Sequence, residues 1–357
     1  EEEGRRGSVT SAPGLSRSVF PRLPSPSDLS IGIDIGGTKV AAGLVDTDGR
    51  VLQRARRETP HRSKSPQVVE DTIAEVISEL RDYREAIAVG IGAAGFVDAT
   101  QSSVLFAPHL SWRHEPLRDA MRRRVGLPVV VENDANAALW AEWRFGAAQG
   151  EDNVVCVNLG TGIGGGVLVD GTLYRGRYGV AGEFGHMQVV AAGHRCECGN
   201  RGCWEQYASG NALVREAREL AAAGSPVAHN LLDRVEGDAS RLTGPLVTAA
   251  AKDGDPAAIE LFEEIGRWLG VGLANLAAAF DPGLFVIGGG VSEAGELLLN
   301  PAREAFRRQL TGRGFRPEAR IVRAQLGNEA GLIGAADLAR DRARIFRRRR
   351  SRSSRLL

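Results

Sequence analysis

Short apolar runs that end in glycine-rich turns are the dominant pattern along this chain of 357 residues. The run 31–35, Ile-Gly-Ile-Asp-Ile, is typical of a buried strand, and Gly-Gly-Thr and a second apolar run over 40–45 follow it. That second run leads to Asp48-Gly49, a dipeptide that favours a hairpin turn. The pattern predicts an antiparallel meander of strands that begins near residue 31.

A second copy of this hairpin lies further along the chain. Residues 153–159 are strand-like, the turn 160–166 is rich in glycine, and a strand at 167–169 ends at Asp170-Gly171. The chain is also longer than a single hydrophobic core usually supports. We therefore expect two lobes, and two lobes imply a cleft between them.

Further helices and strands are predicted between and beyond the two hairpins. Apolar positions three and four residues apart predict helices, whereas short apolar runs bounded by turns predict strands. The predicted helices are 66–80, 135–145, 256–280 and 330–340, and the predicted strands are 86–91, 129–131 and 284–287. The strand 129–131 runs into Glu-Asn-Asp, and the strand 284–287 runs into three glycines.

Charge is unevenly distributed, although the formal net charge is only +1. From residue 341 onward eight arginines accompany one aspartate, while residues 1–29 are balanced, so the remaining body carries −6. An arginine-rich end could contact nucleic-acid or membrane phosphates, but no aromatic residue lies among the arginines of 347–355. We therefore expect 341–357 to be a disordered basic tail.

The first 29 residues are rich in Ser, Pro, Arg and Gly, which predicts a flexible extension. This segment is too short for a winged-helix domain, so a nucleic-acid partner is not expected. No apolar run approaches the roughly 20 residues of a membrane helix, and no secretory signal is recognisable. These features predict a cytoplasmic protein with reduced thiols and no membrane partner.

Three of the four cysteines, Cys196, Cys198 and Cys203, fall within eight residues. With His186 they make a Cys₃His set, which is typical of a closed tetrahedral zinc site. His194 is an alternative fourth ligand, although its closeness to Cys196 would demand a tight turn. We therefore predict a structural Zn²⁺, whereas the fourth cysteine, Cys156, lies in an apolar strand and is interpreted as core.

Glycines beside strands allow backbone N–H groups to approach a phosphate. Three such loops occur, at 36–38, 160–166 and 288–290, and the Walker pattern is absent. Two stretches fit the dinucleotide spacing, at 90–95 and 160–165, but neither is followed by a convincing helix, which that binding mode requires. The loops together predict a phosphate cradle of another kind.

Phosphoryl transfer needs aligned reactants, Mg²⁺ and an acceptor for the hydroxyl proton. Asp134 suits the last task because it lies between a buried strand and a helix. Asn133 or Asp134 could instead cap that helix, and capping would keep Asp134 ionised, so the two interpretations are compatible. By the same logic, Asp34 in the first hairpin is expected to position Mg²⁺ through water.

Five motifs together resemble the ROK family of sugar kinases and repressors, and most of all its ATP-dependent glucokinases of actinobacteria. They are Asp-Ile-Gly-Gly-Thr-Lys at 34–39, Glu-Asn-Asp-Ala-Asn at 132–136, Leu-Gly-Thr-Gly at 159–162, Gly-Glu-Phe-Gly-His at 182–186, and the run 196–205. The resemblance covers about 31–340. It implies the α/β actin/hexokinase-type (ribonuclease H-like) ATPase fold, with a small lobe over 30–133 and 326–340 and a large lobe over 134–325.

The same resemblance implies ATP as phosphoryl donor, glucose as acceptor and a dimer or tetramer of identical chains. Asp134 would be the base on the sugar 6-hydroxyl. The residues implied to contact the other hydroxyls or line the sugar pocket are Ala93, Ala94, Gly95, Asn133, Glu183, His186 and Glu205. The residues implied to hold phosphates are Gly36, Gly37, Thr38, Gly160, Thr161 and Gly162, while Gly288 and Gly289 would border the adenosine. Lys39 is either a further phosphate contact or an exposed salt-bridge residue.

Related functions remain as alternatives. Kinases for N-acetylmannosamine, fructose or allose share the phosphate loops, and a repressor of the family would bind sugar as an effector. A polyphosphate donor is a further alternative, although such relatives generally lack the cysteine cluster. Discrimination between hexose epimers depends on hydrogen-bond geometry at one hydroxyl, which sequence does not give.

Overall fold

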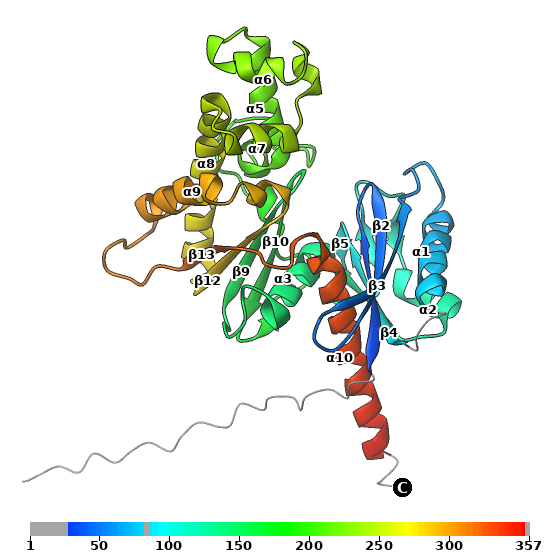
Figure 1. Ribbon diagram of the computed structural model, residues 1–357. Coiled ribbons are helices and arrows are strands. Elements are labelled where there is room, and N and C mark those ends of the chain that lie inside the picture. Colours follow the sequence, from blue (N-terminus) through cyan, green and yellow to red (C-terminus); the bar gives the residue numbers. More distant parts are fainter. Residues whose placement is uncertain (1–27, 82–85, 354–357) are drawn as a thin grey trace, which may run out of the picture.

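Two five-stranded sheets of matching topology form the centres of two lobes (Figure 1). The structure, a computed structural model, describes residues 28–81 and 86–353. Nearly all of the expected flexible extension, residues 1–27, lies outside the described residues.

The small-lobe sheet has the order β3-β2-β1-β4-β8. Strands β1, β2 and β3 form the predicted antiparallel meander, whereas β4 and β8 run parallel to β1. The carboxyl ends of β1, β4 and β8 therefore meet at one edge. The bounds in this lobe are β1 Leu29–Ile35, β2 Lys39–Val45, β3 Val51–Glu58, α1 Pro66–Arg81, β4 Ala86–Ala93, β5 Phe96–Val97, β6 Val104–Phe106, β7 Arg113–Glu115, α2 Leu117–Val125 and β8 Val129–Asn133.

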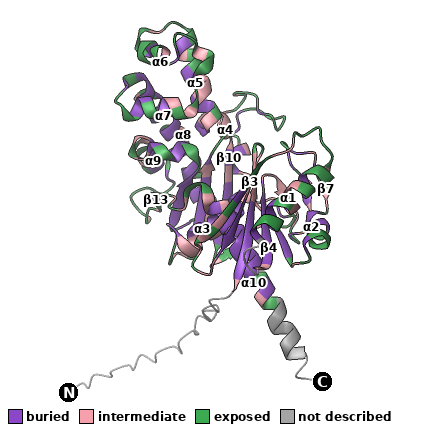
Figure 2. Ribbon diagram, turned by 45° about the vertical axis from the view of Figure 1, so that its right-hand side comes forward, coloured by how far each residue is buried: buried purple, intermediate pink, exposed green. Residues whose placement is uncertain are grey.

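The large-lobe sheet, of order β11-β10-β9-β12-β13, repeats that arrangement. Strands β9, β10 and β11 are antiparallel, and β12 and β13 run parallel to β9. The bounds are β9 Val154–Leu159, β10 Ile163–Val169, β11 Thr172–Leu173, α4 Glu205–Ala208, α5 Gly210–Ala222, α6 His229–Asp233, α7 Gly244–Lys252, α8 Pro256–Phe280, β12 Leu284–Gly288, α9 Glu296–Gln309 and β13 Arg320–Arg323. Figure 2 shows buried strands in both sheets and exposed outer faces on α5, α6 and α7.

Most predicted elements are confirmed, but several boundaries and elements differ. Strand β10 begins at Ile163, four residues before the predicted start, because its glycines pair with β9 where larger side chains would not fit. A Cβ on Gly165 would overlap the ring of Phe184, and one on Gly166 would lie 3.0 Å from the amide oxygen of Asn136. Helices α4 to α7 were not predicted from the sequence.

The prediction of a disordered tail is wrong for residues 341–353, because these residues belong to helix α10, which spans Ala330–Ser353. Arginine is a good helix former, and the first part of this segment packs on the small lobe. Arg342 donates to the Gln101 side chain over 2.8 Å, Arg344 forms an ion pair with Asp28 at 2.9 Å, and Ala343 is buried. Residues 354–357 lie outside the described part of the chain.

Helices α3, Asp134–Phe145, and α10 lie between the sheets and pack against each other (Figure 1). Glycines permit the closest approaches of α10 to its neighbours. A Cβ on Gly32 of β1 would overlap the Leu332 carbonyl, one on Gly90 of β4 would overlap that of Ala335, and one on Gly334 of α10 would overlap that of Ala137 in α3. The backbones of three elements therefore touch α10 directly.

Arg340 reinforces this contact from a fully buried position, 1% exposed. Its guanidinium donates to Asp337, Ser30 and the carbonyls of Val45 and Asp46 over 2.7–2.9 Å. The ion pair with Asp337 lies within α10, and the hydrogen bonds to Ser30, Val45 and Asp46 tie the helix to the first hairpin. None of the helices in the described ranges combines the length and the apolar character needed to cross a bilayer.

Replacing Gly90 with alanine tests the contact between β4 and α10. The added methyl meets backbone, which has no rotamer to yield, so we expect a loss of about 3 kcal/mol in the free energy of unfolding. Gly244→Ala is the matched control, because a Cβ there has its nearest neighbour 3.9 Å away at the start of a helix. Urea titration of both variants measures the difference, and equal midpoints would contradict this packing.

Candidate active site

Asp134 is the first residue of α3, directly after β8. The N-cap of the helix is Asn133, whose Oδ1 accepts from the N–H groups of Ala135 and Asn136, both over 3.0 Å. The Nδ2 of Asn133 donates to Asp134 Oδ1 and to the Gly95 carbonyl, each over 3.1 Å. Capping therefore falls to Asn133, which also orients the neighbouring carboxylate.

The environment of Asp134 favours its protonated form. Burial, followed by the charge of Asp34, raises the pKa of this carboxyl to about 7, and Glu183 adds to the effect. The hydrogen bond from the Ala135 N–H opposes the rise. A carboxyl that titrates near neutral pH is well matched to accepting a proton from a substrate hydroxyl.

Asp34 lies near the end of β1, close enough to Asp134 for the two charges to interact. Burial raises the pKa of Asp34, and the Lys39 ammonium partly opposes that rise. Gly331 at the start of α10 leaves room beside this pair, since a Cβ there would lie 3.3 Å from Asp34 Oδ1. Lys39 is thus placed electrostatically beside Asp34.

Glu183, His186 and Glu205 form the other side of this charged group. Burial raises the pKa of Glu183, the charge of His186 lowers it, and Glu205 raises it. His186 Nδ1 lies 3.6 Å from Glu205 Oε1. Asp134 therefore interacts electrostatically with Glu183, and Glu183 interacts with His186 and Glu205. These interactions link the predicted sugar-contacting side chains to one another.

The glycine loops lie at the ends of the two hairpins. In the turn between β1 and β2, the Gly36 N–H donates to the Lys39 carbonyl over 3.0 Å, and Gly37 and Thr38 are exposed. In the turn between β9 and β10, the Gly160 N–H donates to the Gly162 carbonyl over 3.0 Å. Gly160 and Thr161 are exposed, and a Cβ on Gly162 would lie 2.6 Å from Glu205 Oε2.

The third loop lies against the second. Gly288 ends β12 and pairs in register with Asn158 of β9. Gly289 has a φ of +81°, and a Cβ there would overlap the backbone of Leu159. The structure thus brings 288–289 beside 158–160. On the small lobe, the Ala94 N–H donates to the Ile35 carbonyl over 3.1 Å, which places the Ala94-Gly95 segment beside the end of β1.

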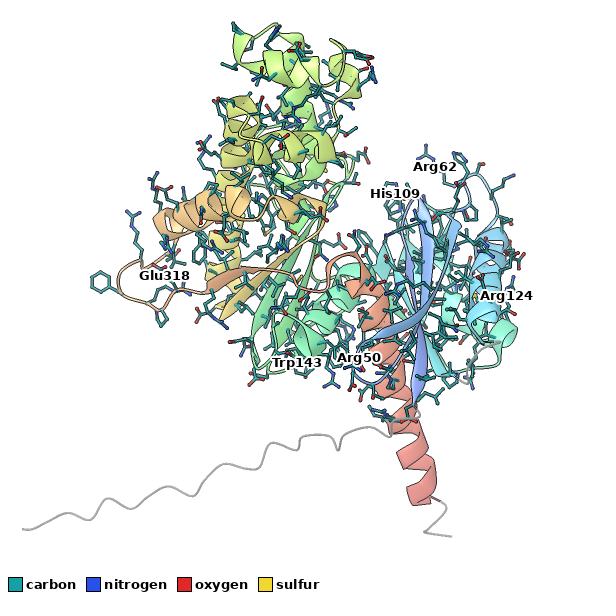
Figure 3. All side chains as sticks on the ribbon, in the orientation of Figure 1. Arg50, Arg62, His109, Arg124, Trp143 and Glu318 are labelled. Carbon is teal, nitrogen blue, oxygen red and sulfur yellow. The ribbon has the colours of Figure 1, made fainter. Side chains whose placement is uncertain are left out.

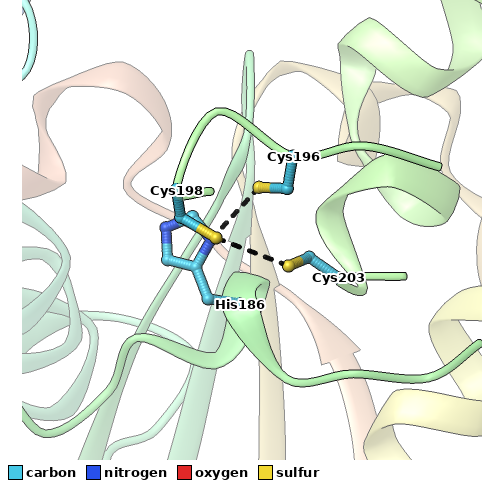
Figure 4. A group of neighbouring side chains, drawn as sticks. All are labelled: His186, Cys196, Cys198 and Cys203. Atoms are coloured by element: carbon cyan, nitrogen blue, oxygen red, sulfur yellow. Dashed lines mark hydrogen bonds between the residues drawn. The ribbon is translucent and has the colours of Figure 1, made fainter. Parts of the chain in front are cut away.

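The cysteine cluster, whose side chains Figure 4 shows, lies next to Glu205, because Cys196 Sγ is 3.1 Å from Glu205 Oε1. One donor atom from each of His186, Cys196, Cys198 and Cys203 lies within 4.8 Å of all the others. The sulfurs of Cys198 and Cys203 are 3.6 Å apart, and Cys196 Sγ is 3.6 Å from His186 Nδ1. Tetrahedral zinc with ordinary bond lengths needs donor separations of about 3.5–3.8 Å, and these two separations lie in that range.

The predicted alternative ligand His194 takes another position. Its ring packs on Tyr207, with centroids 5.2 Å apart, and its backbone N–H donates to the Tyr207 hydroxyl over 2.9 Å. The four-donor group contains His186 and not His194. The short Gly193–Cys196 segment is thus used to anchor the loop on an aromatic side chain.

Sequence reasoning missed two residues at the loops. Asn158 stands beside Gly288, and its position as a lone polar residue in an apolar strand before a glycine turn was the available signal. His109, labelled in Figure 3, lies over the first hairpin turn, 3.1 Å from where a Gly37 Cβ would be. Nothing in the sequence around His109 points to that contact.

A model of the ROK family matches residues 30–342. The chain belongs to the ROK family. It is 50% identical to a glucokinase of Streptomyces coelicolor over 88% of this chain and 98% of that protein. A crystal structure of a ROK family glucokinase from Streptomyces griseus in complex with glucose and AMPPNP matches with 53% identity and a TM-score of 0.81, over 88% and 99% of the two chains.

A xylose repressor of Bacillus subtilis is also similar, at 30% identity over 92% of this chain and 81% of that protein. The family therefore includes both kinases and regulators. Together with the duplicated hairpin sheets, these likenesses establish the actin/hexokinase-type fold for this ROK protein.

The raised pKa of Asp134 predicts a specific pH dependence of stability. Between pH 4 and 7 the folded protein keeps a proton that the unfolded chain loses, so this group lowers stability as pH rises, and the full cost is present above about pH 7. The favourable helix-terminus effect on the charge is smaller than this cost. We expect Asp134→Asn to raise the Tm by about 2–4 °C at pH 8 and to leave it nearly unchanged at pH 4.

Asp98→Asn is a control of opposite sign. Burial acts to raise the pKa of Asp98, but hydrogen bonds from Thr100, Ser103 and Ser102 prevail and lower it to about 2. This carboxylate stabilises the fold at neutral pH, and that stabilisation is lost as pH falls through about 2. Thermal scans of both variants should therefore shift in opposite directions at pH 8, and a shared direction would overturn the assignment for Asp134.

Proposed function

We propose that this protein is an ATP-dependent glucokinase that transfers the γ-phosphoryl group of ATP to the 6-hydroxyl of glucose. The observation that carries the proposal is the part-buried Asp134 carboxylate, held at the end of a strand between phosphate-type glycine turns and a cluster of polar side chains. High identity to Streptomyces glucokinases, across nearly their whole length, supports glucose as the acceptor and ATP as the donor. Fold alone would not indicate the substrate.

Asp134 is proposed as the general base. Its carboxylate would accept the proton of the 6-hydroxyl as the oxygen attacks the γ-phosphorus, and the bond to the leaving ADP oxygen breaks. Asn133, Glu183, His186 and Glu205 would bind the remaining hydroxyls, with Ala94 and Gly95 lining the pocket. These roles rest on the electrostatic and hydrogen-bonded links among the side chains.

The two hairpin turns are proposed to hold the phosphates of ATP, with Gly36, Gly37 and Thr38 from one lobe and Gly160, Thr161 and Gly162 from the other. Gly288 and Gly289, packed on the second turn, would border the adenosine. Mg²⁺ would neutralise phosphate charge, and the carboxylate of the part-buried Asp34 would orient it through water. Lys39, beside Asp34, would add positive charge there.

A structural Zn²⁺ is proposed at His186, Cys196, Cys198 and Cys203. When bound, the ion would order the loop 194–203 and fix the His186 ring through Nδ1. Nε2 of the same ring would then be free to bind a sugar hydroxyl. Glu205, whose Oε1 lies 3.1 Å from Cys196 Sγ, would be oriented by the same cluster.

The zinc proposal predicts about one Zn²⁺ per purified chain, measured by plasma emission spectrometry. Cys198→Ser should lower the metal content at least tenfold and weaken glucose binding, because His186 loses its anchor. His194→Ala is the matched control and should retain full metal, since His194 contacts Tyr207 instead. Loss of zinc in the His194 variant but not in the Cys198 variant would refute the ligand set.

The function is tested by measuring ADP release across a hexose panel, with ATP and with polyphosphate as donors. We expect the highest kcat/KM with glucose and ATP; a preference for N-acetylmannosamine, fructose or allose, or for polyphosphate, would redirect the proposal. Sugar binding without turnover on any substrate would favour a regulator, as in the xylose repressor relative.

Asp134→Ala should lower kcat by about 10³-fold, within the range that a positioned base contributes. Glucose affinity, measured by titration calorimetry, should change less than about threefold because other side chains bind the sugar. Turnover near that of the parent protein would show that Asp134 is not the base.

A further inference from the structure

Glu132 lies two residues before Asp134 and is only 2% exposed. Its Oε1 accepts from the Asn133 backbone N–H over 3.0 Å and from Asn136 Nδ2 over 3.2 Å. Its Oε2 accepts from Gln101 Nε2 over 2.8 Å and from Arg175 over 2.6 Å. A buried carboxylate with every lone-pair direction engaged is a fixed point in the structure.

The cation of this pair comes from the other lobe. Arg175 follows β11 of the large-lobe sheet, and its Nε and Nη2 both face Glu132 Oε2, at 2.7 and 2.6 Å. The same loop packs closely on the small lobe, since a Cβ on Gly179 would overlap the carbonyl of Val97. It then continues to Glu183, one of the proposed sugar contacts.

A second arm of the network reaches α10. Gln101 donates to Glu132 through Nε2, and its Oε1 accepts from Arg342 Nη1. Gln101 has a φ of +57°, a conformation that costs free energy for a residue other than glycine. That backbone is held in place by a turn in which Asp98 accepts from the N–H groups of Ser102 and Ser103, each over 2.7 Å.

We propose that Glu132 and Arg175 are positioning residues for phosphoryl transfer: their ion pair joins the lobes and fixes the strand–helix junction that carries the base. The contacts run from Arg175 to Glu132, from Glu132 to the Asn133 N–H, and from Asn133 Nδ2 to Asp134 Oδ1. The inference rests on the proposed function and deepens it, because it says what aligns the base. Neither residue needs to touch either substrate.

The reason for expecting an effect on rate is geometric. A displacement of about 1 Å at a reacting group can cost on the order of 10²-fold in rate. Without Arg175 the buried Glu132 carboxylate is unpaired on one side and draws in water or a proton, which loosens its hold on the Asn133 N–H. The phosphate-binding turns lie elsewhere on both lobes, so ATP binding is expected to be unaffected.

The test uses the full chain with Glu132→Gln, Arg175→Met, Arg175→Lys and the double variant Glu132→Gln/Arg175→Met. Steady-state kinetics with glucose and ATP are measured at least 15 °C below the Tm of each variant. We expect kcat to fall about 10- to 100-fold in both neutralising variants, with KM for ATP within about twofold. Arg175→Lys should recover part of the loss, because it restores the charge without the planar fork.

Two features separate positioning from mere stabilisation. The double variant should be no slower than the slower single variant, because both substitutions break one pair. Hydrogen exchange of the 130–137 segment should be faster in Arg175→Met than in the parent protein, while β9 is unchanged. Additive kcat losses, or a kcat equal to that of the parent, would overturn the proposal.

Asp337→Asn is the matched control. Asp337 of α10 is similarly buried, at 4% exposure. It accepts from Arg340, Arg144 and Trp140 over 2.7–3.0 Å, and the last two lie in the second half of α3, away from Asp134 at its start. This variant should lose Tm but keep kcat within about twofold, and an equal kcat loss there would also overturn the proposal. If the parent protein shows no turnover with any hexose, the proposed function itself fails, which this design distinguishes from failure of the positioning role.

Discussion

The direct contact of α10 with its neighbours is the constraint on which the rest of the structure depends. Glycines at 32, 90 and 334 remove the side chains that would otherwise separate this helix from β1, β4 and α3. Because interiors are packed as tightly as crystals, such contacts leave no freedom to slide. They place the end of β1 beside the start of α3, and so bring Asp34 and Asp134 into one electrostatic unit.

Duplication of the hairpin sheet explains why the candidate site forms between the lobes. Each copy ends in a glycine turn with exposed residues, Gly37 and Thr38 in one and Gly160 and Thr161 in the other, and the parallel strands of each copy direct their carboxyl ends to one edge. In the small-lobe copy an acidic residue, Asp134, directly follows β8 and begins α3. The large-lobe copy instead carries Asn158 beside Gly288, where a neutral amide adjoins a glycine turn.

Much of this arrangement could be predicted from sequence where a local pattern carried the information. The strand and glycine pattern located both hairpins, and three cysteines in eight residues indicated the donor set that the structure groups with His186. The helix at 341–353 was missed because its support comes from Asp28 and Gln101, more than 240 positions away. Glu132 and Arg175 were likewise missed. A charged residue is expected to be exposed when only its neighbours in sequence are considered, and these two are paired by a contact between different elements.

One side of the candidate site is formed mainly by backbone atoms and the other by side chains, and this difference affects how the sequence can diverge. Under the proposed function, the phosphate-holding turns would present backbone atoms, which a substitution cannot remove, whereas the acceptor side would rely on side chains of the 183–205 segment beside the four-donor group. Under the proposed function, selection could reshape sugar preference by altering that segment while the grip on the nucleotide stayed constant. The same scaffold is thus suited to producing new acceptor specificities in few mutational steps.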